Sequence, residues 1–541
     1  MNSHPGSPSN TLLWQSLGLG LLALLLFCAG ADQQSAIGFD SRFVLFAKEM
    51  LRHGPGFFPT TYGQPYADYS SATTLLVWLF SLPSGQVSSF TAWLPTAMAS
   101  ALIVSLVYRL VAPYSRTWAL LSVALLLLSN TFISETRAVS LDQMLAAVSL
   151  AVFYLGYAHD HFGARRHLAA IFLLLVLGFA IRGPIGLVIP TGMLCSYYLL
   201  GGQWRRLFSV GCGALLLLVA CVALLLWLAK LSGGQAFVDD VIRMQFMGRM
   251  DGSEGSSDVF YYFTSSLGNY ALAYPLAILA WIAVLLSRPV EQSQALKLLR
   301  LCTAAGLIVM IGLSIPQAKK ARYLLPMLPM AAIIAAYPFQ AGRGRVMNGL
   351  RVLIQGIWLL LPGLLIVGLL LLRRKFPEQL AELTPMLVLL GLLQAISLGL
   401  LCKRQWRVVG LAYSAVLAVW ACYIGVFEPV QHQLYDTRTF SRAAMQLIDA
   451  EPAPVVLHRL GKDAKAIKFM VNLDRDLQPQ FSQQAQDLAQ LAGPAWVILD
   501  QSDLGDLQGT PLAGLTPVLS GRFDKNDFIL LHLPKAAAAQ P

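Results

Sequence analysis

Long apolar runs separated by short polar segments follow one another along the chain from residue 11 to residue 427. Runs such as 12–28, 207–229 and 352–372 have the roughly 20 residues that a helix needs to cross a hydrocarbon core of about 30 Å. This pattern predicts an all-α polytopic membrane domain over residues 1–427. We expect about thirteen spans, at approximately 11–30, 88–108, 117–133, 143–158, 168–181, 184–200, 207–230, 266–287, 301–316, 323–340, 352–372, 385–401 and 408–427.

The pattern changes after residue 427. Short β-type runs then alternate with helical runs, as in a small α/β domain. We therefore predict an α/β domain over residues 428–541. Its β-type runs are 454–460, 495–499 and 528–533, and its helical runs are 441–450 and 482–491.

Two loops between spans are long, at residues 31–87 and 232–265. Within the first, residues 39–52 have the apolar spacing of an amphipathic helix, which we expect to lie on the membrane surface. Residues 54–69 are rich in Gly, Pro and aromatic residues and predict an irregular loop. The second long loop contains a Gly/Ser-rich, acidic run at 248–258 whose composition is typical of a mobile flap.

The composition agrees with a membrane protein. Of the 541 residues, 56% are hydrophobic and 12% are charged, whereas a soluble domain carries about 25% charged residues. An ordinary soluble enzyme is therefore excluded. The seven cysteines show no spacing of a metal or redox site.

The net charge of +11 is unevenly distributed between the two sides of the predicted spans. The loops on one side sum to +13, those on the other side to +1, and the segment from residue 428 to −3. By the positive-inside rule the +13 side is cytoplasmic. We therefore expect a protein of the bacterial cytoplasmic (inner) membrane with a cytoplasmic N-terminus and an extracytoplasmic C-terminal domain. The basic excess indicates topology and not nucleic-acid binding.

Charged residues collect at the outer ends of the spans, and almost none lies in the middle of a span. Lys and Arg at headgroup level can pair with a lipid-linked phosphate, and a nearby carboxylate can act as a base. Each residue also has a simpler explanation: Asp40 and Asp142 suit helix starts, and the basic residues suit lipid headgroups. The collected residues are Asp40, Arg42, Glu135, Arg137, Asp142, Arg182, Arg243, Arg249, Lys319, Lys320 and Arg322.

The order of five short motifs resembles that of the protein O-mannosyltransferase and aminoarabinose transferase superfamily, which are membrane glycosyltransferases with the GT-C fold. GFDSRF at 38–43 is similar to the Asp-Glu-x-Arg-Tyr element that opens the first outer loop of that family. GQPYADYS at 63–70 resembles its Gly-Lys-Pro-Tyr-x-Glu-Lys-Pro stretch. Further likenesses are at 137–142, at Arg182-Gly183-Pro184 and at QAKKARYLLP, residues 317–326. The resemblance covers roughly residues 10–340.

The resemblance implies transfer of a hexosyl or pentosyl residue from a polyprenyl-phosphate carrier to an acceptor at the outer face of the membrane, with inversion. The acceptor classes are lipid A or lipopolysaccharide, another glycan, or a protein. Asp40 would be the base and Asp142 would steady the site. Lys319 or Lys320, Arg249 and Tyr323 would hold the carrier phosphate, and Tyr66 and Asp68 would line the sugar pocket. Further substrate-binding candidates are Arg42, Tyr69, Arg137, Arg182 and Arg322.

Three positions depart from the family pattern. Ser41 stands where the family often has a second acid, Phe43 replaces Tyr, and Tyr69 replaces a phosphate-binding Lys of the aminoarabinose transferases. The last change argues against the aminoarabinose transferase itself. A single acid is a poor cation site, so we predict no metal ligands. The resemblance does not firmly imply any cofactor, and a divalent cation stays an alternative.

Two other classes of function stay open. A flippase or transporter of lipid-linked glycans would place ionisable groups within spans or duplicate half of the chain, and neither pattern is evident. An O-antigen-type polymerase or ligase would share the large outer loops. The position of Asp40 directly after the first span favours the glycosyltransferase.

Overall fold

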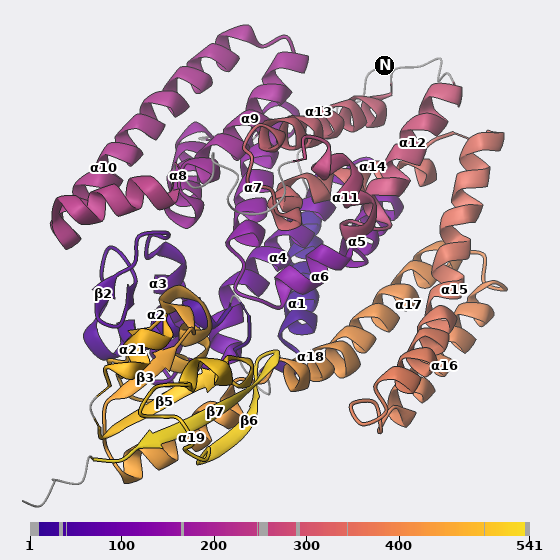
Figure 1. Cartoon of the computed structure of the whole chain (residues 1–541). Helices are drawn as coiled ribbons and strands as arrows, with labels where there is room; N and C mark the ends of the chain where they lie inside the picture. Colours follow the sequence, from indigo (N-terminus) through magenta and orange to yellow (C-terminus); the bar gives the residue numbers. More distant parts are fainter. Residues whose placement is uncertain are drawn as a thin grey trace, which may run out of the picture.

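The computed structural model describes residues 10–31, 36–38, 40–163, 167–245, 247, 258–287, 293–342, 344–491 and 493–535. A bundle of helices forms the larger part, and a small domain with a β-sheet lies against one end of it (Figure 1). The bundle contains α1 (Asn10–Cys28), α4 (Ser89–Val111), α5 (Arg116–Leu127), α6 (Asn130–Thr136), α7 (Leu141–Phe162), α8 (His167–Arg182), α9 (Pro184–Leu200), α10 (Trp204–Gln245), α11 (Tyr261–Asn269), α12 (Ala273–Ser287), α13 (Gln294–Ser314), η3 (Ala321–Met327), α14 (Leu328–Ala336), η4 (Tyr337–Phe339), α15 (Arg345–Lys375), α16 (Thr384–Leu400) and α17 (Arg407–Cys422).

Each of the thirteen predicted spans is a helix or a bent pair of helices. Among the described residues, eight helices are long and apolar enough to cross a membrane, and two bent pairs raise this number to ten. Three shorter apolar helices, α8, α9 and α16, account for the rest of the predicted thirteen. The protein is therefore a multi-pass membrane protein.

The two bent pairs depart from the straight spans that the sequence suggested. The axes of α5 and α6 meet at 72°, and those of α11 and α12 meet at 108°. Leu272, between α11 and α12, has a φ of 69°, a conformation that L-residues rarely adopt. Both bends place short, polar helices beside the η3 segment, where the candidate site lies.

A glycine sets the turn that carries Arg182. Gly183 has a φ of 66° and joins α8 directly to α9, and Pro184 is the first residue of α9. This is the glycine-then-proline order expected at a helix junction. Gly178 and Gly186 let the two helices touch, because a Cβ at Gly178 would lie 2.2 Å from the carbonyl oxygen of Gly186. Arg182 is thereby fixed at the tip of a tight helical hairpin.

The first long loop packs against the bundle and the C-terminal domain. It contains α2 (Asp40–His53), β1 (Thr60–Thr61), β2 (Gln64–Pro65) and α3 (Ala72–Ser81). The amphipathic helix that the sequence predicted is present as α2, and its location at the membrane surface stays a prediction. Phe43 and Phe46 are fully buried, because α3 and the C-terminal domain cover the apolar face of α2.

The second long loop is more helical than predicted. α10 continues to Gln245 after a break at Gly233 and Gly234, whose backbone angles are non-helical. α11 then occupies much of the end of the predicted loop. Most of the predicted flap at 248–258 lies outside the described residues.

The C-terminal domain has the predicted α/β composition. Its five strands have the order β4-β3-β5-β7-β6; β3 is parallel to β4 and β5, and β7 is antiparallel to β5 and β6. The strands β4 and β6 were not predicted. The elements are α19 (Arg438–Ala450), β3 (Val455–His458), η6 (Gly461–Lys465), α20 (Ala466–Met470), β4 (Gln480–Ser482), α21 (Ala485–Ala489), β5 (Ala495–Asp500), η7 (Gln501–Leu507), β6 (Leu519–Phe523) and β7 (Asn526–Leu533).

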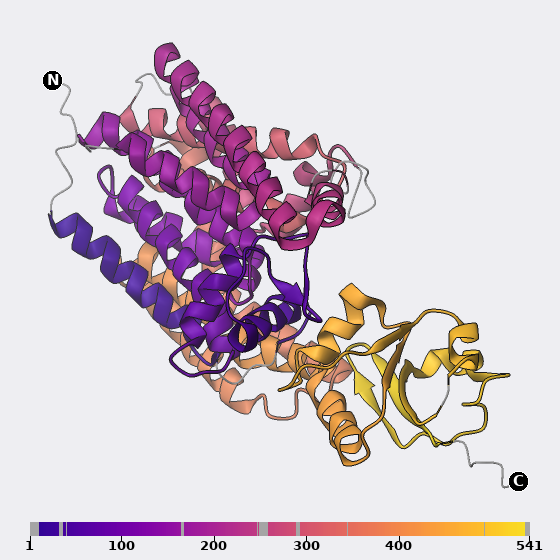
Figure 2. The same ribbon diagram turned by 90° about the vertical axis from the view of Figure 1, so that its left-hand side faces the viewer.

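The last span does not stop at the expected boundary between residues 427 and 428. After α17, a π-helical turn, η5 (Tyr423–Phe427), leads directly into α18 (Glu428–Leu434), so the helical run extends to Leu434. The α/β fold begins beyond that residue. Figure 2 shows α1 beginning at the end of the bundle that is remote from the C-terminal domain.

Candidate functional site

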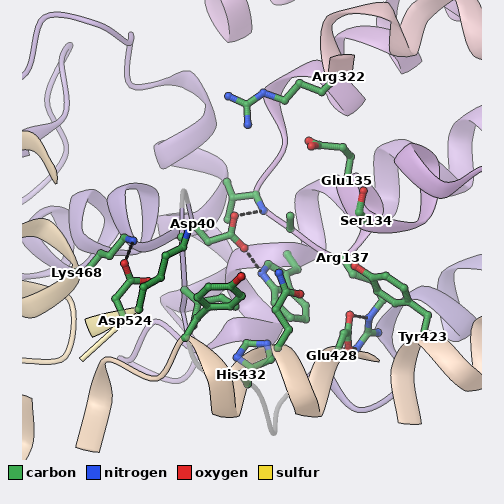
Figure 3. Close-up of a pocket in the computed structure, with 18 residues that line it drawn as sticks. Asp40, Ser134, Glu135, Arg137, Arg322, Tyr423, Glu428, His432, Lys468 and Asp524 are labelled. Atoms are coloured by element: carbon green, nitrogen blue, oxygen red, sulfur yellow. Dashed lines mark hydrogen bonds and ion pairs between the residues drawn. The ribbon is translucent and has the colours of Figure 1, made fainter. Parts of the chain in front are cut away.

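A cavity of about 380 Å³ lies where the first long loop, the bundle and the C-terminal domain meet (Figure 3). We call it the main cavity. Its wall combines residues from opposite ends of the chain: α2 and α6 from the N-terminal half, η3, and the region after residue 420. The lining residues are Ile37, Gly38, Asp40, Trp93, Ser134, Glu135, Arg137, Ala138, Val139, Arg322, Tyr423, Glu428, Gln431, His432, Tyr435, Lys468, Asp524 and Lys525.

Asp40, the first residue of α2, holds its carboxylate at the centre of this cavity (Figure 3). Trp93 Nε1 donates to Oδ2 at 2.8 Å, and the backbone N–H of Val139 donates to Oδ1 at 3.0 Å. Burial raises the pKa of Asp40 to about 7, against the lowering effect of these two hydrogen bonds. A carboxylate with such a pKa is a good general base near neutral pH, and the two donors fix its orientation.

Arg322 lies at one end of the main cavity, and the Lys468–Asp524 pair lies at the other side, with Asp40 between them (Figure 3). Glu135 faces the cavity from α6 and accepts a hydrogen bond from Ser140 Oγ at 2.5 Å. The guanidinium of Arg322 is 3.2 Å from Asp142 Oδ2. A cation and a carboxylate therefore line the same cavity, as a displacement at a phosphate-linked carbon requires.

Arg137 lines the main cavity, but its guanidinium is fully engaged with protein groups. It forms a two-point ion pair with Glu428. Arg137 Nε donates to Glu428 Oε1, and Arg137 Nη2 donates to Glu428 Oε2 at 2.6 Å. Its Nη1 donates to the carbonyl oxygens of Phe27 and Ala29, each at 2.8 Å. Arg137 was predicted to bind substrate, whereas this arrangement favours a role in joining the end of α1, the α6–α7 connection and α18.

Asp142 and Arg182 form a buried ion pair next to the main cavity. Arg182 Nε donates to Asp142 Oδ1 at 2.9 Å, and both side chains are almost inaccessible to solvent. The ring of Tyr323 lies 5.1 Å from the Arg182 guanidinium. These three residues line a cavity of about 20 Å³, which we call the arginine pocket. Because Asp142 also pairs with Arg322, it connects this pocket to the main cavity.

Asp68 and Tyr69 meet Arg182 from the other side. They line a further small cavity with Gln245, whose amide donates to the carbonyl of Ala67 at 3.0 Å. Burial raises the pKa of Tyr69, so its hydroxyl stays protonated. Three residues predicted from two motifs, Asp68, Tyr69 and Asp142, thus lie around the guanidinium of Arg182, which was predicted from a third motif.

Arg42 and Tyr66 do not line the main cavity. Arg42 lies 3.8 Å from Asp68 and donates through Nη2 to the backbone carbonyl of Asp463 at 2.9 Å. Its guanidinium also lies 5.3 Å from the centre of the Tyr66 ring. Arg42 therefore connects the first long loop to the C-terminal domain.

The remaining predicted cations lie at the entrance to η3. Lys319 is 3% exposed, which rules out simple contact with lipid headgroups for this side chain, and Lys320 directly precedes the first helical residue. Arg249 lies outside the described residues. Among the described residues, no three His, Cys, Asp or Glu side chains are grouped as metal ligands.

The sequence did not single out the residues that complete the main cavity. Trp93 is an aromatic residue near the start of a span, a common position that carries no catalytic signal. Lys468 and Asp524 form an ion pair of 2.7 Å, and Lys525 follows Asp524 in the β6–β7 turn. These residues belong to no motif, and only the packing of the C-terminal domain brings them to Asp40.

Comparison with known proteins agrees with the observed fold. Residues 32–234 match the family model of dolichyl-phosphate-mannose-protein mannosyltransferases. The structure is similar to that of ArnT from Cupriavidus metallidurans in the apo state, with a TM-score of 0.71 and 15% identity over 96% of this chain and 98% of that chain. The chain has the GT-C fold. The resemblance that the motifs indicated is thus confirmed for the fold.

A second similar structure is that of ArnT from Cupriavidus metallidurans bound to undecaprenyl phosphate, with a TM-score of 0.68, 15% identity and the same coverage. The GT-C likeness extends over nearly the whole chain and therefore includes the C-terminal domain. The search of curated protein sequences gave no match. The matched family region contains Asp40, Asp68, Asp142 and Arg182, whereas Arg322 and the C-terminal residues of the main cavity lie beyond it.

Proposed function

We propose that this protein is an inverting glycosyltransferase that moves a sugar from a polyprenyl-phosphate carrier to an acceptor at the outer face of the bacterial cytoplasmic membrane. The acceptor is a lipid, a glycan or a protein of the cell envelope. The N-terminus is cytoplasmic and the C-terminal domain extracytoplasmic in this proposal, as the charge distribution of the loops predicts.

The observation that carries the proposal is the environment of Asp40. Its carboxylate is buried, oriented by Trp93 and Val139, and open to a cavity large enough for a sugar unit. An ion pair with a structural purpose would bring a cation into direct contact with the carboxylate. Here two N–H groups hold Asp40, which leaves the carboxylate able to accept a proton.

The proposed reaction is a single displacement. Asp40 takes the proton of an acceptor hydroxyl while the acceptor oxygen forms a bond to the anomeric carbon. The bond between that carbon and the phosphate oxygen of the carrier breaks, and its electron pair leaves with the phosphate. One displacement inverts the anomeric carbon, the proton ends on Asp40, and the carrier departs as a phosphate monoester.

The donor phosphate is proposed to bind on the side of Arg182 and Arg322. Both guanidiniums share Asp142, so they are held in place before the substrate arrives. Negative charge on the phosphate grows as its bond to the sugar breaks, and fixed cations therefore stabilise the transition state more than the bound donor. Lys319 and Lys320 supply additional positive charge at the start of η3.

An apolar groove offers a path for the polyprenyl chain. It has a volume of about 250 Å³ and lies between α12, α13 and the η3–α14 run. Met310 and Met327 belong to its wall, and each lies within about one helical turn of a residue of the arginine pocket, Leu313 and Tyr323 respectively. A carrier with its phosphate near Arg182 would thus place its chain along this groove.

The acceptor is proposed to enter from the side of the C-terminal domain. Lys468, Asp524 and Lys525 present charge of both signs to the main cavity, opposite Arg322. An acceptor hydroxyl on that side would face Asp40, with the sugar between it and the phosphate. The C-terminal domain would thereby select the acceptor.

A transfer assay tests the proposal. Purified wild type and Asp40→Asn would be incubated with radiolabelled polyprenyl-phosphate sugars and an envelope extract, after thermal unfolding has established that both are folded. We expect wild type to label one class of acceptor and the variant to lose most of that activity. Asp449→Asn, an exposed acid paired with Arg475, is the matched control and should behave as wild type.

No labelling by wild type across a broad panel of donors, or equal labelling by Asp40→Asn, would contradict the proposal. Flipping and chain-length assays would then test the transporter and polymerase alternatives.

A further inference from the structure

A second charged pocket lies on another face of α2, at the N-terminal end of α4. It has a volume of about 200 Å³ and shares no lining residue with the main cavity. Lys48 of α2, Ser88 and Ser89 at the start of α4, and Arg438 and Arg442 of α19 lie in its wall. We call it the cationic pocket.

The positive charges of this pocket are poorly balanced. Arg438 and Arg442 lie one turn apart on α19, and among the described residues neither has a carboxylate within ion-pair distance. Like charges at this spacing repel, and a cation in the first turn of a helix opposes the helix dipole. Lys48 donates to the carbonyl of Val471 at 2.9 Å and lies 3.6 Å from Asp474, which does not line the pocket. A bound anion would relieve this repulsion.

The pocket also lies at one end of a helix that is long and apolar enough to cross a membrane. α4 is an apolar helix of 23 residues that begins at Ser89, and we therefore expect its first turn at the membrane boundary. Leu82 and Phe90, which flank the pocket segment in the sequence, are 45% and 38% exposed. Val87 adds an apolar side chain to the pocket wall. Cations next to exposed apolar side chains at this level suit an anionic headgroup with acyl chains beside it.

We propose that the cationic pocket binds the phosphate of an anionic membrane lipid. The guanidiniums of Arg438 and Arg442 pair with the phosphate oxygens, since planar guanidiniums bind phosphate bidentately. The acyl chains lie over Leu82 and Phe90. Because α19 belongs to the C-terminal domain and α4 to the bundle, the lipid bridges the two. This binding is separate from the transfer reaction and goes beyond the proposed function.

Native mass spectrometry of the purified full chain in a neutral detergent tests this site. The probe is palmitoyl-oleoyl phosphatidic acid, with the matching phosphatidylcholine as the neutral comparison. Four proteins are compared: wild type, the double variant Arg438→Gln/Arg442→Gln, Arg522→Gln and Asp40→Asn. Arg522 is an exposed arginine of the same domain that lines neither pocket, and Asp40 lies in the main cavity.

We expect wild type to bind one phosphatidic acid more tightly than phosphatidylcholine, and the double variant to bind it at least about tenfold more weakly, because two charge-assisted contacts are lost. Arg522→Gln and Asp40→Asn should bind as wild type does. The double variant should unfold at the temperature of lipid-free wild type or above it, since it loses repulsion, so weak binding would not reflect misfolding.

Undiminished binding by the double variant would overturn the proposal, as would equal loss in Arg522→Gln. Competition with inorganic phosphate distinguishes the two sources of the anion. Phosphatidic acid that stays bound in millimolar phosphate supports the lipid, whereas its displacement would show that the pocket binds free phosphate and would overturn the assignment to a lipid.

Discussion

The two sides of Asp40 are built differently. On the side of the bundle, Asp142 and Arg182 come from helix ends, and both are buried in an ion pair that also holds Arg322. On the opposite side, Lys468 comes from α20 and Lys525 from an exposed β-turn. The first side is fixed before any substrate binds, which suits the phosphate of the proposed donor. The second side is more open, which suits the proposed acceptor.

The largest expected effect concerns Arg137, which belongs to neither side. Its guanidinium is wholly inaccessible and depends on Glu428. Glu428→Ala leaves a buried charge without its partner and should lower the free energy of unfolding by about 3–5 kcal/mol. Chemical denaturation measures this loss. The transfer rate per folded molecule should change little, and a stable variant that is inactive would instead make Arg137 a substrate-binding residue.

Arg182→Ala should produce the next largest effect. Loss of one fixed cation near the leaving phosphate should lower the transfer rate by about 10²–10³-fold, as for loss of one charge-stabilising donor elsewhere. Steady-state kinetics with varied donor measure the change. Arg182→Lys keeps the charge but loses the planar guanidinium, so its transfer rate should lie between those of wild type and Arg182→Ala. If Arg182→Ala is folded and fully active, the proposal that the donor phosphate binds beside Arg182 is contradicted.

A smaller effect is expected on the acceptor side. Lys525→Gln should raise the acceptor KM by about tenfold, because one charge-assisted contact is lost, and should leave the donor KM unchanged. Lys535→Gln, an exposed lysine beyond β7, is the matched control. If Lys525→Gln changes only the donor KM, the donor and not the acceptor binds on this side of the main cavity.

The difference between the two sides also explains how far the sequence could lead. Apolar runs predicted the helical segments of the bundle, of which eight to ten among the described residues are long and apolar enough to cross a membrane, because the hydrophobic requirement of a span is local. The helix–glycine–proline junction at Arg182 and the acid that opens α2 are local as well. Each places a side chain through the backbone geometry of a few neighbouring residues, and the sequence could therefore propose Asp40, Asp142 and Arg182, which line the main cavity and the arginine pocket.

The acceptor side depends on contacts that no local pattern records. Lys468 reaches the main cavity only because α20 packs on α2, about 420 residues earlier in the chain. The same packing buries the apolar face of α2, a contact that the helical spacing of this segment alone does not reveal. Arg42 was predicted from a motif as a substrate-binding residue, yet its observed hydrogen-bond partner is a carbonyl of the C-terminal domain.

The pH dependence of transfer tests the central claim, that Asp40 is the base, most directly. Burial places the pKa of Asp40 at about 7, and the carboxylate is the active form, so kcat/KM should rise with pH up to about 7 and then level off.

Trp93→Phe removes a hydrogen bond that favours the carboxylate, and should therefore move this rise to higher pH. His432→Gln removes another titratable group of the main cavity and should leave the rise in place. A rise that moves with His432→Gln and not with Trp93→Phe, or a rate that does not change between pH 5.5 and 8, would contradict the assignment of Asp40 as the base.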